Sequence, residues 1–305
     1  MPLNKNKVLV VGMDGLRFDR LVALAPPVLS SLMSSGAYGT SKLPYGEAAA
    51  PRTESPGEVV PKTPEPDGTG RVISSRTDSG PGWSSIATGT WPDKHGVVDN
   101  SFTNANFTKF PDFLSRAKQA RPDLTTSAFL SWAELDEHGA FGPTDHRMIL
   151  DGYALTWTHA DRQIADAAER HLADPDTDPD LVFVYLGDTD EVAHDLGPHC
   201  PEYAAALHAQ DAYLGRLLDA VRARPAERWT VLVTTDHGHV DEGGHGGTSD
   251  EERTVFVIAN RLGEDLGGRA LAEPRLVDVA PTALTLLGVP LDPSWELDGE
   301  PLFNN

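Results

Sequence analysis

The chain has 305 residues, enough for one large domain or two small ones, and its 39% apolar and 23% charged residues are typical of a globular protein. The net charge at pH 7 is 25 − 46 = −21, which argues against binding of a nucleic-acid polymer. The single cysteine allows no internal disulfide, and no apolar run is long enough for a membrane span or a signal-peptide core. We therefore expect a cytoplasmic protein with no membrane partner; the sequence leaves its oligomeric state open.

Short apolar, β-branched runs alternate with longer segments that have helical spacing. The runs predict buried parallel strands at Val8–Val11, Thr125–Leu130, Leu181–Leu186, Thr230–Thr235 and Thr254–Ala259. The longer segments predict helices at Arg17–Met33, Phe110–Lys118, Ala160–Leu172, Tyr203–Val221 and Val277–Leu287. This alternation indicates an α/β fold whose central sheet is mainly parallel, with helices on both faces. We expect one catalytic domain spanning residues 1–305.

The segment Pro44–Gly70 interrupts this pattern, because it contains six prolines and almost no apolar side chains. It predicts a loop insertion that is either functional or disordered. It follows a predicted strand near residues 38–43 and ends shortly before Ser79, with Arg52, Lys62 and Arg71 in or beside it. The functional alternative is an active-site lid that selects the substrate.

Acidic and histidine side chains follow three of the predicted strands. Asp14 follows the first strand, Asp190 and His194 follow the Leu181 strand, and Asp236 and His237 follow the Thr230 strand directly. In an open α/β sheet the carboxyl ends of the strands form the ligand crevice. Three strands thus bring metal-ligand side chains to one edge of the sheet.

The spacing of these side chains defines two sets. Asp190 and His194 are four residues apart, on one face of a helical turn, and His245 in a glycine-rich loop adds a third ligand. A carboxylate with two imidazoles suits zinc and leaves a position open for substrate. The second set comprises Asp14, Asp236 and His237. Each residue alone could be a helix cap, a solvated charge or a core histidine, but two complete sets favour two metal ions.

Ser79 opens a glycine-containing stretch that resembles a helix start. Free backbone N–H groups and the helix dipole favour an anion at such a place. Beside a metal, the Ser79 hydroxyl could lose its proton near neutral pH and attack phosphorus. The simpler alternative is an ordinary helix N-cap.

These motifs resemble the alkaline phosphatase superfamily and, within it, the nucleotide pyrophosphatase/phosphodiesterase branch. The resemblance covers residues 8 to about 303, with Pro44–Gly70 unmatched. The stretches that carry it are 11–15, 88–100, 190–198, 235–238, 245–246 and 277–288.

The resemblance implies a two-zinc phosphoester hydrolase, a phosphodiesterase or nucleotide pyrophosphatase that acts on a small phosphate ester through a phosphoserine intermediate. One zinc would be held by Asp190, His194 and His245. The other would be held by Asp14, Asp236 and His237, with Ser79 as the nucleophile and a bridging ligand.

Two positions depart from the expected pattern. Ser79 stands where the diesterases usually carry threonine, and Gly82 stands where we expect a phosphate-binding amide. Arg76 and the Gly80 N–H group are therefore the candidate substrate-binding groups. A phosphomonoesterase with the same site remains an alternative, because the sequence does not show what contacts the third phosphate oxygen. A non-catalytic protein that binds a phosphorylated metabolite is the alternative from another class.

Other enzyme classes fit less well. A sulfatase would need arginine where Trp83 stands, and the G-x-G-x-x-G spacing of dinucleotide-binding enzymes is absent. A mutase of the superfamily would need a larger cap than this chain can hold. His95 is expected to hold a turn, and His239 either to support Asp236 and His237 or to be exposed.

Overall fold

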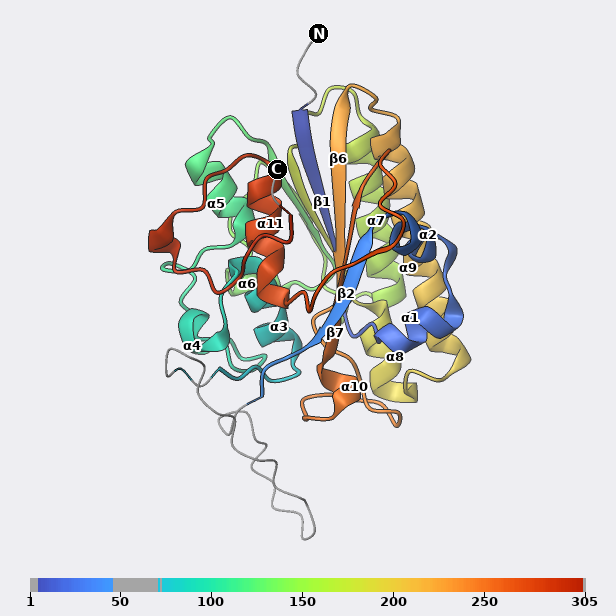
Figure 1. The fold of residues 1–305 in the computed structure, drawn as a ribbon. Coiled ribbons are helices and arrows are strands. Elements are labelled where there is room, and N and C mark those ends of the chain that lie inside the picture. Colours follow the sequence, from blue (N-terminus) through green and yellow to red (C-terminus); the bar gives the residue numbers. More distant parts are fainter. Residues whose placement is uncertain (1–4, 46–70, 72, 304–305) are drawn as a thin grey trace.

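A computed structural model describes residues 5–45, 71 and 73–303. They form one eight-stranded sheet in the order β4-β3-β5-β1-β6-β7-β2-β8 (Figure 1). The strands are β1 (Lys5–Met13), β2 (Ala37–Lys42), β3 (Thr126–Leu130), β4 (His146–Ile149), β5 (Leu181–Leu186), β6 (Glu227–Thr234), β7 (Thr254–Arg261) and β8 (Arg269–Ala270). All five predicted strands and the strand expected near residues 38–43 are present. β4 and β8 were not predicted, because at four and two residues they are too short to leave a clear apolar pattern.

Seven strands run in one direction, and β7 runs antiparallel to both of its neighbours, β6 and β2. The prediction that Thr254–Ala259 is a parallel strand was therefore wrong in direction. The chain leaves β6, makes an irregular loop and re-enters the sheet from the same edge, because no crossover helix carries it back. A strand buried on both faces is continuously apolar, so its pattern does not reveal its direction.

Helices cover both faces of the sheet (Figure 1). One face carries α3 (Ser79–Thr88), α4 (Pro92–His95), α5 (Phe113–Ala120), α6 (Glu134–Glu137) and α11 (Val279–Leu286). The other carries α1 (Phe18–Leu24), α2 (Pro27–Ser35), α7 (Trp157–Ala173), α8 (Asp188–Leu196) and α9 (Pro201–Arg222). The short α10 (Asp250–Arg253) directly precedes β7, and the single turns η2 (Leu276–Asp278) and η3 (Pro293–Trp295) are 3₁₀ helices. The α/β class with a mainly parallel sheet is confirmed.

Alternate residues of β1 enter different cores. Val8 and Val10 pack into the core under α3, α5 and α11, whereas Leu9 and Val11 pack into the core under α2, α7 and α9. This period of two is the pleat of a strand that is buried on both faces. β1 therefore lies at the centre of the molecule, and its carboxyl end is fixed from both sides.

Two predicted helices begin or divide differently from the expectation. The segment Arg17–Met33 forms two helices, because Ala25 adopts a left-handed φ of 46° and Pro26 and Pro27 follow it. Proline has no N–H group to continue a helix but is well suited to a first helical turn. The segment Val277–Leu287 begins as the 3₁₀ turn η2 before α11.

Most of the segment Pro44–Gly70 lies outside the described residues, so the lid hypothesis stays a prediction. The described chain on either side of it is joined, since the Ser75 N–H group donates to the Pro44 carbonyl at 2.8 Å. Arg71 pairs with Asp93 and Asp298 at 2.6 and 2.7 Å, so its charge already has acidic partners. In the part of the chain that is described, no helix is both long and apolar enough to cross a membrane.

A buried carboxylate on α7 fixes the start of α8. Asp161 is fully buried and accepts four hydrogen bonds, from Ser131 Oγ at 2.6 Å, Gly187 N at 2.9 Å, Asp188 N at 3.0 Å and Gln210 Nε2 at 2.9 Å. Two of these donors are the first free N–H groups of α8, which an acceptor must satisfy. Asp161 thus sets the position of the helix that carries Asp190 and His194.

His95 ties the chain after α4 to α3. The Val97 N–H group donates to His95 Nδ1, and His95 Nε2 lies 3.1 Å from Ser85 Oγ on α3. Because Nδ1 accepts a hydrogen bond, Nε2 carries the ring proton and donates to Ser85. The prediction that His95 holds a turn is confirmed.

We expect Asp161→Ala to lower the free energy of unfolding by ~3 kcal/mol or more, because it leaves several buried donors without an acceptor at ~1–3 kcal/mol each. Denaturant unfolding would measure this loss. Asp166→Ala is a matched control on the same helix, since Asp166 is partly exposed and pairs with Arg216. It should cost ~1 kcal/mol or less, and equal losses in the two variants would contradict the assigned role.

Burial lowers the pKa of His95 to about 3, and nearby Asp298 opposes this only in part. The unfolded chain then binds a proton that the folded protein excludes, so stability is lost as the pH falls through the ordinary histidine pKa. Between pH 7 and pH 5 the wild type should lose ~2 kcal/mol more than His95→Gln, which lacks the titrating ring. Denaturant unfolding at the two pH values would measure this difference, and parallel losses would contradict it.

Candidate active site

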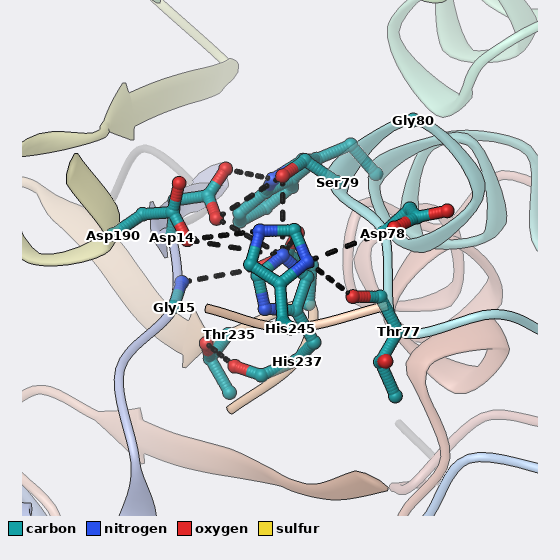
Figure 2. A network of polar contacts seen from close by, with 12 residues as sticks. Asp14, Gly15, Thr77, Asp78, Ser79, Gly80, Asp190, Thr235, His237 and His245 are labelled. Atoms are coloured by element: carbon teal, nitrogen blue, oxygen red, sulfur yellow. Dashed lines mark hydrogen bonds and ion pairs between the residues drawn. The ribbon is translucent and has the colours of Figure 1, made fainter. Parts of the chain in front are cut away.

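The predicted site residues meet at the carboxyl edge of the sheet. Asp14 follows β1, Asp190 and His194 lie on α8 after β5, and Asp236 and His237 follow β6. Because β5, β1 and β6 are neighbours in the sheet, these side chains are brought together. Ser79 begins α3, and His245 comes from the loop between β6 and α10. Figure 2 shows Asp14, Ser79, Asp190, His237 and His245 pointing toward one another.

The first cluster consists of Asp190, His194 and His245, whose potential ligand atoms lie within 4.8 Å of one another. His194 Nε2 lies 3.3 Å from Asp190 Oδ2 and 2.9 Å from His245 Nε2. The Nδ1 atom of His245 lies 2.6 Å from the Thr77 carbonyl, so it carries the ring proton and leaves the Nε2 lone pair free. A ligating histidine usually has this arrangement.

The second cluster consists of Asp14, Asp236 and His237, all of them buried. His237 Nε2 lies 3.2 Å from Asp236 Oδ2 and 3.5 Å from Asp14 Oδ1. Its Nδ1 atom donates to the Gly238 carbonyl at 3.0 Å, which again leaves the Nε2 lone pair free. The clusters match the two predicted ligand sets in composition.

The carboxylates of the site are charged groups in a buried place. Burial, with the charge of Asp190, raises the pKa of Asp14 to about 7. Burial and the charges of Asp14 and Asp190 raise the pKa of Asp236 well above its usual range. Asp236 Oδ2 is buried without a hydrogen-bond partner. A divalent cation would offset this repulsion and satisfy that oxygen, so the residues present fit a metal site.

Two aromatic side chains hold Asp14. Trp83 Nε1 donates to Asp14 Oδ2 at 2.8 Å, and the Tyr185 hydroxyl donates to the same oxygen. The other oxygen, Oδ1, is left facing Ser79 and His237. Sequence reasoning did not find this role, because Trp83 and Tyr185 look like ordinary core residues of a helix and a strand.

Ser79 is the first residue of α3, and Asp78 occupies the N-cap position. The Ser79 Oγ atom lies 3.1 Å from His237 Nε2 and 3.5 Å from Asp14 Oδ1. The simple N-cap interpretation of Ser79 was therefore wrong, because the hydroxyl faces the second cluster. Gly82 permits the close approach of α3 to Asp236, since a Cβ atom at position 82 would lie 2.7 Å from Asp236 Cβ.

The predicted substrate-binding groups are close to Ser79, but both have partners. The Gly80 N–H group donates to Asn100 Oδ1 at 2.7 Å, and Arg76 Nε lies 2.7 Å from Asp78 Oδ2. The Asn100 side chain therefore lies at the start of α3, beside Gly80, although position 82 itself carries no amide. Asn100 lies in the stretch 88–100 that carries the family resemblance, but no role was predicted for it.

His239 is not exposed, and its hydrogen bond goes to Asp190 rather than to Asp236 or His237. It is fully buried, and its Nε2 atom lies 2.8 Å from Asp190 Oδ1. The expectation that His239 is exposed was wrong; its ring packs edge-on against His237, with ring centroids 5.7 Å apart, and its hydrogen bond goes to Asp190 on α8. Asp190, His237 and His239 also form a third group with ligand atoms within 4.8 Å.

Curated relatives include an uncharacterized pyrophosphatase/phosphodiesterase of Schizosaccharomyces pombe, 24% identical over 253 residues. That match covers 77% of this chain and 45% of the relative. A 2,3-bisphosphoglycerate-independent phosphoglycerate mutase of Desulforudis audaxviator is 38% identical over 264 residues, covering 70% of this chain and 49% of the mutase. The chain thus spans about half the length of these two relatives.

Solved structures confirm the fold. Murine ectonucleotide pyrophosphatase/phosphodiesterase 5 superimposes with a TM-score of 0.64 at 15% identity, covering 93% of this chain and 95% of that one. The phosphonate monoester hydrolase of Agrobacterium radiobacter also gives a TM-score of 0.64 at 15% identity, covering 97% of this chain and 76% of that one.

The family model for type I phosphodiesterase/nucleotide pyrophosphatase matches residues 74–250, which include Ser79 and every proposed metal ligand except Asp14. This match covers more than half of the chain. It agrees with the resemblance seen in the sequence motifs and with the fold. The chain therefore belongs to the type I phosphodiesterase/nucleotide pyrophosphatase family.

Proposed function

We propose that the chain is a metal-dependent phosphoester hydrolase that uses Ser79 as its nucleophile, with a small phosphodiester or nucleotide pyrophosphate as substrate. The observation that carries this proposal is the position of Ser79 Oγ, next to His237 Nε2 and Asp14 Oδ1. Family membership supports the reaction class. An inactive variant of the murine neighbour was solved in complex with AMP, which makes a nucleotide a reasonable first substrate to test.

Two divalent cations, which we propose to be zinc, fit the two clusters. Asp190, His194 and His245 would hold one, and Asp14, Asp236 and His237 would hold the other with Ser79 Oγ. Imidazole nitrogen favours zinc over magnesium or calcium. When bound, the cations would stabilise negative charge on the oxygens that enter and leave phosphorus.

Side chains of the protein position the atoms that react. Ser79 Oγ attacks phosphorus in line, so an Oγ–P bond forms while the bond to the leaving oxygen breaks. Water then attacks the phosphoserine and releases phosphate or a phosphate monoester, restoring the hydroxyl. Asp14 keeps one oxygen directed at Ser79, because Trp83 and Tyr185 hold the other.

Asn100 and Arg76 are the proposed contacts to the non-bridging phosphate oxygens. Because Asn100 Oδ1 accepts the Gly80 N–H group, the orientation of its amide is fixed and its Nδ2 group remains as a donor. Arg76 lies beside the same helix start and is one-third exposed. A guanidinium suits a phosphate because its donors match the oxygen geometry.

A phosphomonoesterase with the same site remains the main alternative, and a non-catalytic phosphometabolite-binding protein is a remote one. The similarity to mutases adds phosphoryl transfer between positions of one substrate to the reactions worth testing. A panel of an aryl phosphodiester, an aryl phosphomonoester, a dinucleoside pyrophosphate and a phosphoglycerate would separate these activities. Absence of turnover on every member would contradict hydrolysis.

We expect the purified protein to contain about two zinc ions per chain. Asp236→Asn and His194→Ala should each lower both metal content and activity, because each removes a ligand from one cluster. His199→Ala is a matched control, since His199 pairs with Asp241 outside the clusters. Metal analysis by mass spectrometry would measure the content. Full activity in magnesium alone, without any transition metal, would contradict the zinc proposal.

We expect Ser79→Ala to lose nearly all hydrolysis while keeping its fold and most of its metal, because six other side chains hold the ions. Ser79→Thr should retain activity, since its hydroxyl occupies the same place. Ser84→Ala is the control on the same helix, because the Ser84 hydroxyl is buried without a partner. Steady-state kinetics would compare the variants. Undiminished turnover by Ser79→Ala would show that water attacks directly.

A further inference from the structure

His237, His239 and His245 differ in which ring nitrogen has a hydrogen-bond partner. His237 and His245 each place Nδ1 against a backbone carbonyl, at 3.0 and 2.6 Å, so the Nε2 lone pair is free. His239 has the opposite arrangement. Its Nε2 atom lies 2.8 Å from Asp190 Oδ1, and its Nδ1 atom is buried without a hydrogen-bond partner.

The His239 ring is held in this orientation by its neighbours. The backbone carbonyl of His239 accepts a hydrogen bond from Arg17 Nη1 at 3.0 Å, and Arg17 is itself buried and paired with Asp19 and Asp241. On the other side, a Cβ atom at Gly15 would lie only 2.5 Å from His239 Nε2. Gly15 has a left-handed φ of 62° and leaves just enough room for the ring.

These contacts select one tautomer of His239. A neutral imidazole ring carries a single N–H group. If Nδ1 carried the proton, a buried N–H group would have no acceptor, at a cost of ~1–3 kcal/mol. The Nε2 lone pair would also face a carboxylate oxygen. Protonation at Nε2 avoids both penalties and gives a hydrogen bond to Asp190.

We infer that His239 is a positioning residue that donates its Nε2–H group to Asp190, and that it is not a metal ligand. A nitrogen that carries a proton has no lone pair for a cation, although His239 lies within ligand distance of Asp190 and His237. The hydrogen bond occupies Asp190 Oδ1 and leaves Oδ2 facing His194 at 3.3 Å.

This inference rests on the proposed metal site and assigns a separate role within it. The effect of His239 on the metal is indirect, through the orientation of Asp190. Loss of a supporting partner of this kind typically weakens metal affinity ~10–100-fold. Loss of a ligand should instead remove the metal whatever polar group replaces it.

The test compares His239→Leu with His239→Gln, because the glutamine amide can restore an N–H donor. Zinc affinity of the full chain is measured by competition with a chromogenic chelator. His239→Leu should weaken the affinity of one zinc site ~10–100-fold, and His239→Gln should stay within ~3-fold of the wild type, as expected for a restored hydrogen bond. His245→Gln is the ligand-loss comparison and should bind about one zinc fewer. His199→Gln, at an exposed histidine, should bind as the wild type does.

A second measurement does not depend on any variant folding. ¹⁵N-resolved NMR of the wild-type imidazoles should place the His239 proton on Nε2, with and without zinc. A proton on Nδ1, or zinc on Nε2, would overturn the inference. Equal loss of zinc in His239→Gln and His239→Leu would also overturn it while leaving the proposed function intact. A wild type that binds no zinc would instead overturn the proposed metal site together with this role.

Discussion

Three carboxylates that lie side by side, two of them buried, are the constraint on which this site depends. Asp14, Asp190 and Asp236 follow neighbouring strands. Asp14 and Asp236 are buried and Asp190 is 15% exposed, so water screens their charges from one another only weakly. Burial and their mutual repulsion raise the pKa values of Asp14 and Asp236, so the site requires compensating positive charge. Asp190 differs, because the imidazoles of His194 and His239 beside it outweigh its burial and hold its pKa well below the usual range.

The polar groups around the carboxylates fix their orientation. Trp83 and Tyr185 hold one oxygen of Asp14 from the side of α3, and the Thr189 hydroxyl donates to the Asp14 backbone carbonyl at 2.7 Å. Asp161 sets the start of α8 from the opposite face of the sheet. The site is thus held by both layers of helices, which explains why its side chains come from distant parts of the chain.

The ends of the strands and the acidic and histidine residues that follow them can be recognised in the sequence. The members of both clusters could therefore be predicted. Spacing identified Asp190 and His194 because a helical turn leaves its pattern in consecutive residues. Contacts between distant residues leave no such pattern, so the pairing of Asn100 with Gly80 was missed. The direction of β7 was also missed, because a doubly buried strand has the same apolar pattern in either direction.

The role of His239 was hidden for a related reason. A histidine two residues after His237 gives no indication of which neighbour its ring contacts, and only the path of the loop turns it toward Asp190. The choice between ligand and support depends on which nitrogen has a hydrogen-bond partner. That information exists only in the folded chain.

Because β7 runs antiparallel to β6, the loop that supplies His245 connects two neighbouring strands at one edge of the sheet. Both ends of this loop lie at the same edge of the sheet, where the Gly238 N–H group donates to the Glu252 carbonyl at 2.7 Å. Thr77, two residues before Ser79, joins its middle by hydrogen bonds with Gly246 and Gly247. The loop therefore has little conformational entropy left to lose when a ligand binds. A displacement of Ser79 would also act on His245, because the neighbouring Thr77 is hydrogen-bonded to the segment that carries His245.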